Sequence, residues 1–143
     1  MKRTQLWLIA VAAIAPRVVV LLRERDDILT SFTDKSDDFA QTFVHHGTFS
    51  FIPGEPSAYT QPLYGFFLVP IYWIFGRTWW SVGGVQILVA TATAFLVYAI
   101  GAHLISRRAG VLAALVSTLN PYLVWHDVHL NREIVDQLVA AAF

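Results

Sequence analysis

Residues 82–106 read VGGVQILVATATAFLVYAIGAHLIS and contain no formally charged side chain. A helix of about 25 residues measures roughly 37 Å, which exceeds the roughly 30 Å hydrocarbon core of a bilayer. Glycine and alanine recur along the segment, and small residues of this kind let membrane helices pack closely. The segment therefore predicts a transmembrane helix, and it decides the fold class of the chain.

The composition of the whole chain favours a membrane protein. Hydrophobic residues make up 56% of the 143 residues and charged residues only 14%, against roughly 25% charged residues in soluble domains. The formal net charge is zero, so no basic surface predicts a nucleic-acid partner. The chain contains no cysteine, which excludes disulfides and thiolate metal sites.

Three further apolar segments predict an all-α, multi-pass arrangement. Residues 6–22 predict a first span rather than a cleaved signal peptide, because the apolar run continues beyond the cleavage-like site at residues 13–15. Residues 109–125 predict another span, and residues 134–143 begin a fourth. As a helix, the last segment measures about 15 Å, so we expect the chain to be the N-terminal part of a longer transmembrane domain.

The segment over residues 62–75 is short for a span and contains Pro70. If it lies in the membrane interface, the basic pairs at residues 2–3 and 107–108 both fall on the cytoplasmic side, as the positive-inside rule favours. We therefore expect an interfacial segment, a cytoplasmic N-terminus and one long external loop over residues 23–61. Arg17, inside the first span, is expected to face protein or to snorkel.

The external loop is too aromatic to be a plain linker. Phe39 and Phe43 recur at helical spacing, and Gly47 follows them. This pattern predicts a short amphipathic helix over residues 35–46 that lies on the membrane surface and ends at the glycine.

A first polar cluster within this loop includes Asp34, Lys35, Asp37 and Asp38. We select the adjacent pair, Asp37 and Asp38, as candidate catalytic residues, because one of two neighbouring carboxylates can serve as a general base. Solvated surface charge is the alternative explanation.

A second polar cluster follows the third apolar segment and is expected on the same face. It includes His126, Arg132 and Glu133, which we select as candidate substrate-binding residues, although Arg132 and Glu133 are most simply a local ion pair. His126, Asp127 and His129 could also offer ligands to a divalent metal, together with His45 or His46 of the first loop, but the spacing matches no strong zinc signature. We therefore predict no metal site and keep a divalent ion as the weaker alternative.

Four stretches, taken in order, resemble the GT-C membrane glycosyltransferases of glycosyltransferase family 39, which includes protein O-mannosyltransferases and aminoarabinose transferases. They are SDDFAQTFVHHGTFSF (36–51), PSAYTQPLYGFFLVPIYWIFG (56–76), LISRRAGVLAALVSTLNPYLVW (104–125) and HLNREIVDQLVAAAF (129–143). The family's acidic pair corresponds to Asp37 and Asp38, and its glutamate at the start of the fourth span to Glu133. Two features depart from the family: the second acid is aspartate, and NREI replaces the commoner Thr-Glu-Pro.

The resemblance implies inverting transfer of a sugar from a polyprenyl-phosphate donor to a hydroxyl of a protein, lipid or glycan acceptor, at the external face of the cell membrane. Such a reaction needs one aligned base and cations near the departing phosphate. Asp37 or Asp38 would be the base, with Asp37 slightly preferred, and Arg132 a cation near the phosphate. No organic cofactor is expected, and a fragment with half of the site would be inactive alone.

Two other functions remain open from the sequence. A transporter would place the acids in an outer vestibule, but it predicts charged residues inside the spans, and residues 82–106 and 109–125 contain none. A non-catalytic membrane subunit would instead bind a partner through its aromatic loop.

Overall fold

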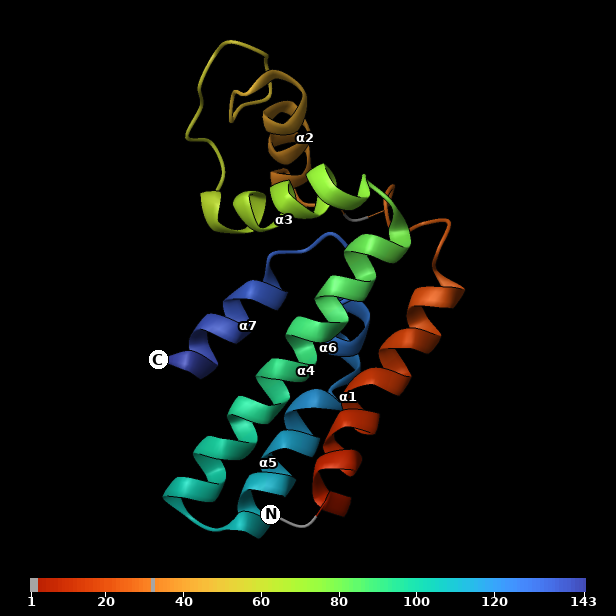
Figure 1. The fold of residues 1–143 in the computed structure, drawn as a ribbon, viewed down its shortest axis with the longest axis vertical. Helices are drawn as coiled ribbons and strands as arrows, with labels where there is room; N and C mark the ends of the chain where they lie inside the picture. The colour runs from red at the N-terminus through yellow and green to blue at the C-terminus, as the bar shows by residue number, and fades with distance from the viewer. Residues whose placement is uncertain (1–2, 32) are drawn as a thin grey trace.

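The computed structural model describes residues 3–31 and 33–143, and within them it is all-helical, as predicted, with no strand (Figure 1). Of the basic pair at residues 2–3, only Arg3 is therefore described. In chain order the helices are α1 (Arg3–Arg23), α2 (Ser36–His46), α3 (Pro62–Phe75), α4 (Trp79–Leu104), α5 (Arg107–Thr118), α6 (Pro121–His126) and α7 (Glu133–Ala142).

The helices α1, α4 and α5 pack side by side as a bundle (Figure 1). Of the described helices, α1 with 21 residues and α4 with 26 residues are long and apolar enough to cross a membrane. They correspond to the helices predicted over residues 6–22 and 82–106. Large apolar side chains stay exposed on their outer faces, including Trp7, Val19 and Leu88.

The backbones of α4 and α5 approach closely where the chain turns back on itself. A Cβ on Gly101 would lie 2.8 Å from the Cα of Gly110, and a Cβ on Gly110 would lie 2.7 Å from the backbone nitrogen of Ala102. Ser106 caps the start of α5 by accepting a hydrogen bond from the backbone N–H of Ala109. The predicted use of small residues for close packing is confirmed at Gly101.

The single helix expected over residues 109–125 is instead two helices. α5 ends at Thr118, and Asn120 adopts an extended conformation before Pro121 begins α6. A proline disfavours helical geometry in the residue before it and suits the first position of a new helix. The Asn120 side chain caps this new helix by accepting from the N–H of Tyr122. As a helix of 12 residues, α5 measures only about 18 Å.

The helices α2 and α3 form a smaller layer at one end of the bundle, where α3 lies across the end of α4 (Figure 1). The helix predicted over residues 35–46 is confirmed as α2, and it ends at Gly47, whose φ of 71° is left-handed. Aromatic rings fill the space between α2, the following loop and α3. The contacting ring pairs are Phe39–Phe49, Phe39–Phe51, Phe49–Phe66 and Phe43–Phe66.

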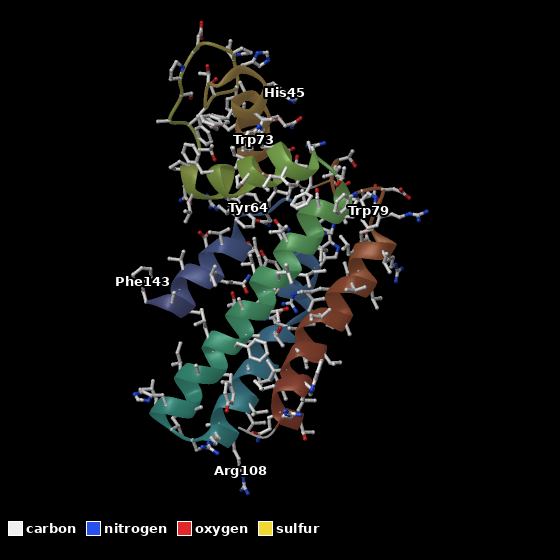
Figure 2. The ribbon with its side chains drawn as sticks, viewed as in Figure 1. His45, Tyr64, Trp73, Trp79, Arg108 and Phe143 are labelled. Atoms are coloured by element: carbon white, nitrogen blue, oxygen red, sulfur yellow. The ribbon has the colours of Figure 1, made fainter. Side chains whose placement is uncertain are left out.

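One face of α3 is buried and the other is exposed and apolar. Tyr64 and Leu68 point into the protein, whereas Leu63 and Trp73 are 53% and 78% exposed. Figure 2 shows Trp73 and Arg108 at opposite ends of the molecule. The aromatic layer and the basic start of α5 therefore lie at opposite ends of the bundle.

Candidate functional site

A polar pocket of about 490 Å³ lies where the first loop meets the linker between α6 and α7. Each of its three walls comes from residues that immediately precede or begin a helix. The walls are Thr33, Asp34 and Lys35 before α2, Tyr59, Thr60 and Gln61 before α3, and Asn131, Arg132 and Glu133 at the start of α7. The amino ends of three helices therefore border one pocket.

Hydrogen bonds between distant segments hold these walls together. The backbone N–H of Asp34 donates to the carbonyl of Leu130 over 2.8 Å, which joins the first loop to the linker before α7. Gln86 of α4 donates to the carbonyls of Asp127 and His129, each over 2.8 Å. Its side-chain oxygen accepts from the Tyr64 hydroxyl over 2.7 Å. The polar clusters of the first loop and of the α6–α7 linker thus meet, as predicted.

The pocket contains a cation and a carboxylate from each of the two clusters. Lys35 donates to the Tyr59 hydroxyl over 2.7 Å, and this bond and the lysine charge lower the pKa of the Tyr59 phenol. Asp34 accepts from the N–H of Ser36 through Oδ1. Arg132 contributes the second cation and Glu133 the second carboxylate.

One oxygen of Glu133 accepts a hydrogen bond, and the other lies 3.8 Å from Nδ1 of His126. The Tyr122 hydroxyl donates to Oε1 over 2.9 Å, which raises the pKa of Tyr122. Oε2 is buried and has no hydrogen-bond partner among the described residues. Arg132 lies 4.0 Å from Asp136 rather than on Glu133, so the predicted local pair between Arg132 and Glu133 is replaced by contacts with other residues.

Asp37, the preferred catalytic candidate, lies outside the pocket lining. It is 3% exposed and its carboxylate is held by Arg77, with Nη2 2.6 Å from Oδ2 and Nε 3.0 Å from Oδ1. Tyr72 also donates to Oδ1. The bond to Asp37 raises the pKa of Arg77, and burial, followed by the charge of Asp37, raises the pKa of Tyr72. This carboxylate therefore joins α2 to the turn between α3 and α4.

Asp38 has a different environment, although it is the next residue. Its side chain is exposed, and nothing among the described residues bonds to its carboxylate. It also lies outside the pocket lining. The loop aspartate that does line the pocket is Asp34, which belongs to the predicted cluster but was not selected, because nothing in the local sequence distinguishes it from its neighbours.

His126 lies next to the pocket wall without lining the pocket. Its ring packs on Tyr122 with centroids 4.0 Å apart, and its Nδ1 is 2.8 Å from the side-chain nitrogen of Asn131 and 3.8 Å from Glu133. Of the three predicted substrate-binding residues, Arg132 and Glu133 therefore line the pocket. His126 supports Asn131 and Glu133 from the side.

The possible metal ligands of the second cluster point to different partners. Asp127 is fully buried on Arg17, whereas the Nδ1 of His129 contacts the carbonyl of Trp125. Within residues 3–31 and 33–143, no group of three or more histidine, aspartate or glutamate side chains is arranged to hold a metal ion. The arrangement of His126, Asp127 and His129 considered from the sequence is therefore not formed by these residues.

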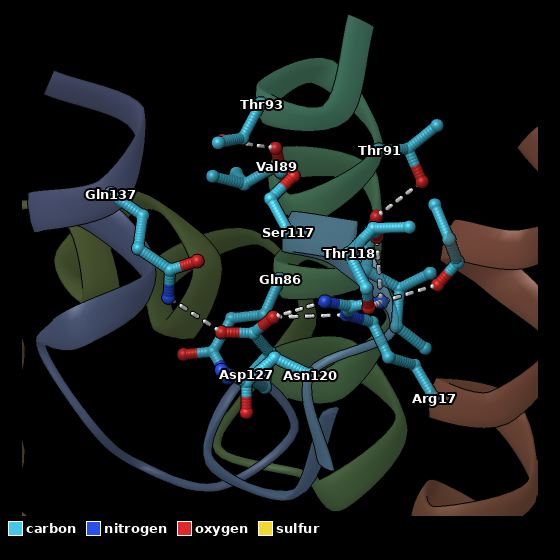
Figure 3. A network of polar contacts seen from close by, with 12 residues as sticks. Arg17, Gln86, Val89, Thr91, Thr93, Ser117, Thr118, Asn120, Asp127 and Gln137 are labelled. Carbon is cyan, nitrogen blue, oxygen red and sulfur yellow. Dashed lines mark hydrogen bonds and ion pairs between the residues drawn. The ribbon is translucent and has the colours of Figure 1, made fainter. Parts of the chain in front are cut away.

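The Arg17–Asp127 pair is the centre of a buried polar network (Figure 3). Nη2 and Nε of Arg17 lie 2.6 and 2.9 Å from Oδ2 of Asp127. Nη1 of Arg17 donates to Ala13 and Thr118, and Gln137 donates to the other oxygen of Asp127. The prediction that Arg17 faces protein is confirmed, and its partner lies at the end of α6.

Comparison of the chain with known protein families, curated proteins and solved structures found no match. The polar pocket and its position relative to the apolar helices are therefore the features that bear on function.

Proposed function

We propose that the chain forms part of a multi-pass GT-C membrane glycosyltransferase. It would transfer a sugar from a polyprenyl-phosphate donor to a hydroxyl of a protein, lipid or glycan acceptor at the external face of the cell membrane. The observation that carries the proposal is the polar pocket, in which two cations and two carboxylates lie beside the apolar layer of α3. The resemblance of four ordered sequence stretches to glycosyltransferase family 39 supports the same reaction.

The distribution of exposed apolar side chains supports the membrane setting. The outer faces of α1 and α4 suit lipid, and α3 lies crosswise at their aromatic end, where tryptophan favours the membrane interface (Figure 1). Arg107 and Arg108 lie at the opposite end, which the positive-inside rule favours for the cytoplasm. In this proposed orientation the N-terminus would lie inside the cell and the pocket at the external level of the lipid phosphates.

The electrostatics of the pocket suit a phosphate. Backbone N–H groups at helix amino ends carry partial positive charge and bind anions, and α2, α3 and α7 all begin at the pocket. Lys35 and Arg132 add two formal positive charges, which balance those of Asp34 and Glu133 in the same lining, so the phosphate would have to lie on the side of the two cations. A leaving phosphate would therefore be stabilised as its negative charge develops.

The carboxylates suit the acceptor hydroxyl. We assign the role of base to the loop aspartate that lines the pocket, Asp34, because Arg77 and Tyr72 already occupy the carboxylate of Asp37. Asp34 would take the hydroxyl proton while the acceptor oxygen attacks the anomeric carbon and the bond from that carbon to the phosphate oxygen breaks. Glu133, which also lines the pocket, would accept a hydrogen bond from the sugar or acceptor. A single displacement of this kind inverts the anomeric carbon.

The test is a transfer assay with the protein expressed from its complete reading frame in membranes. Released polyprenyl phosphate is measured with a panel of polyprenyl-phosphate sugars. We expect release by the wild type and a loss of roughly 100-fold or more in Asp34→Asn, because general bases contribute about 10²- to 10⁴-fold. Asp38→Asn, which changes an exposed carboxylate outside the pocket, is the matched control.

Two outcomes would count against this function. A folded wild type that releases no polyprenyl phosphate from any donor would reject glycosyl transfer and favour a non-catalytic membrane subunit. Full activity of Asp34→Asn, with loss in Asp38→Asn, would return the role of base to the acidic pair.

A further inference from the structure

We propose that Gln86 is a positioning residue that fixes the separation of two walls of the polar pocket. The structural part of this inference depends on the contacts of Gln86 alone. Its effect on reaction rate rests on the proposed glycosyl transfer.

The hydrogen bonds of Gln86 determine the orientation of its amide. The side chain is 0% exposed within an otherwise apolar part of α4, where an unpaired amide would be costly. Its nitrogen lies 2.8 Å from each of two carbonyls, at Asp127 and His129. Since carbonyls cannot donate, both bonds require the nitrogen at this position, and the oxygen must accept from Tyr64.

The partners of Gln86 lie next to two different walls of the pocket in the sequence. Asp127 and His129 lie in the linker that runs directly into the wall formed by residues 131–133. Tyr64 lies in the first turn of α3, next to the wall formed by residues 59–61, and between α3 and the bundle (Figure 2). Burial raises the pKa of Tyr64, so its hydroxyl keeps the proton that it donates.

Contacts that do not involve Gln86 hold the helices of the bundle together. α1, α4 and α5 share an apolar cluster that includes Ile9, Ala94 and Ala114, and the Arg17–Asp127 pair joins α1 to the end of α6. Loss of the Gln86 amide would remove its bond to the carbonyl of Asp127 and one of the two donors to the carbonyl of His129, which also accepts from the N–H of Asn131. It would also remove the acceptor of the Tyr64 hydroxyl. We therefore expect the walls to move relative to one another while the bundle keeps its geometry.

Distances between paired spin labels on introduced cysteines test this expectation. The 143 residues contain no cysteine, and any cysteine elsewhere in the complete chain is first replaced by serine. The protein is studied as its full chain in lipid nanodiscs. Labels at Leu63 of α3 and Val139 of α7 report on the two walls, and labels at Val19 of α1 and Leu88 of α4 report on the bundle. All four side chains are exposed.

The test variant is Gln86→Met, which has similar length and cannot form the three hydrogen bonds. We expect the Leu63–Val139 distance distribution to broaden or shift and the Val19–Leu88 distribution to stay at its wild-type width. Tyr64→Phe, which removes one of the three bonds, should give a smaller change in the first pair. An unchanged Leu63–Val139 distribution in Gln86→Met would overturn the proposal, and so would equal broadening of both pairs, which would indicate a general loss of structure.

Transfer kinetics add a readout that a purely structural role would leave unchanged. We expect Gln86→Met to lower kcat by roughly 10- to 100-fold, because small displacements of catalytic groups have effects of this size, with a smaller change in KM. Wild-type kcat in this variant would overturn the positioning role in the reaction. If the wild type transfers no sugar but the labels respond as expected, the proposed function fails and the positioning of the walls by Gln86 stands.

Discussion

At the scale of single residues, Asp37 and Asp38 show how adjacent carboxylates acquire different roles. Successive residues on a helix point about 100° apart, so the first turn of α2 turns one carboxylate inward and leaves the other in solvent. Asp37 meets Arg77 and Tyr72, whereas Asp38 is exposed. Asp37 and Asp38 are therefore adjacent in the sequence but have separate environments in the structure.

This difference predicts unequal losses of stability. Asp37→Asn should lower the free energy of unfolding by about 2–3 kcal/mol, somewhat less than the roughly 3–5 kcal/mol of a fully buried pair, since Arg77 is 29% exposed. Asp38→Asn should change it by less than about 0.5 kcal/mol. Denaturant unfolding of both variants measures the difference, and equal losses would show that Arg77 does not stabilise the fold through Asp37.

A second residue-scale prediction concerns the titration of Tyr59. The ammonium group of Lys35 favours the phenolate, so Tyr59 should ionise at a lower pH than an ordinary tyrosine with a pKa of 10.0. Ultraviolet absorbance of the phenolate follows the titration, and comparison with Tyr59→Phe identifies its signal. Lys35→Met should move the midpoint to higher pH. A midpoint that does not respond to this change would exclude the Lys35 contact in solution.

At the scale of elements, the contact between α4 and α5 depends on the absence of side chains. A Cβ on Gly110 would meet backbone atoms of α4 at Tyr98 and Ala102, which cannot move aside as a flexible side chain would. Gly84, which lies in α4, has no atom within 4 Å of the position where a Cβ would be. The two glycines therefore allow a matched comparison.

We predict that Gly110→Ala destabilises the protein by about 1–3 kcal/mol, the usual cost of overpacking. Gly84→Ala should be neutral or stabilising by up to about 1 kcal/mol, because alanine is the better helix former. Thermal unfolding of both variants in the same lipid provides the measurement. Destabilisation by Gly84→Ala as large as that by Gly110→Ala would argue against a close contact specific to α5.

At the scale of the whole molecule, the Arg17–Asp127 pair connects the first helix to the end of α6. Arg17→Met alone should cost about 3–5 kcal/mol because it leaves a buried carboxylate unpaired. The double variant Arg17→Met/Asp127→Asn should recover part of this loss. A double-mutant cycle by denaturant unfolding measures the coupling, and strictly additive losses would contradict a direct interaction.

Local signals account for the parts of this molecule that the sequence predicted. The uncharged run of α4 and the glycine that ends α2 are both signals within a single stretch of sequence. The meeting of the first loop with the start of α7 also followed from topology. The individual partners of these residues could not be predicted from the sequence. The Arg77–Asp37 pair, the bonds of Gln86 and the position of Asp34 in the pocket depend on how distant elements pack.

The Arg17–Asp127 pair also has a consequence for biogenesis in the proposed bilayer. The two residues are 110 positions apart, so the ribosome delivers α1 long before it makes the partner of Arg17. An unpaired arginine at the centre of a helix costs about 2.5–3.5 kcal/mol on insertion scales. If α1 spans the proposed bilayer, it would therefore insert before Arg17 has its partner, and the contact between α1 and the end of α6 would form only after the chain has been synthesised through Asp127.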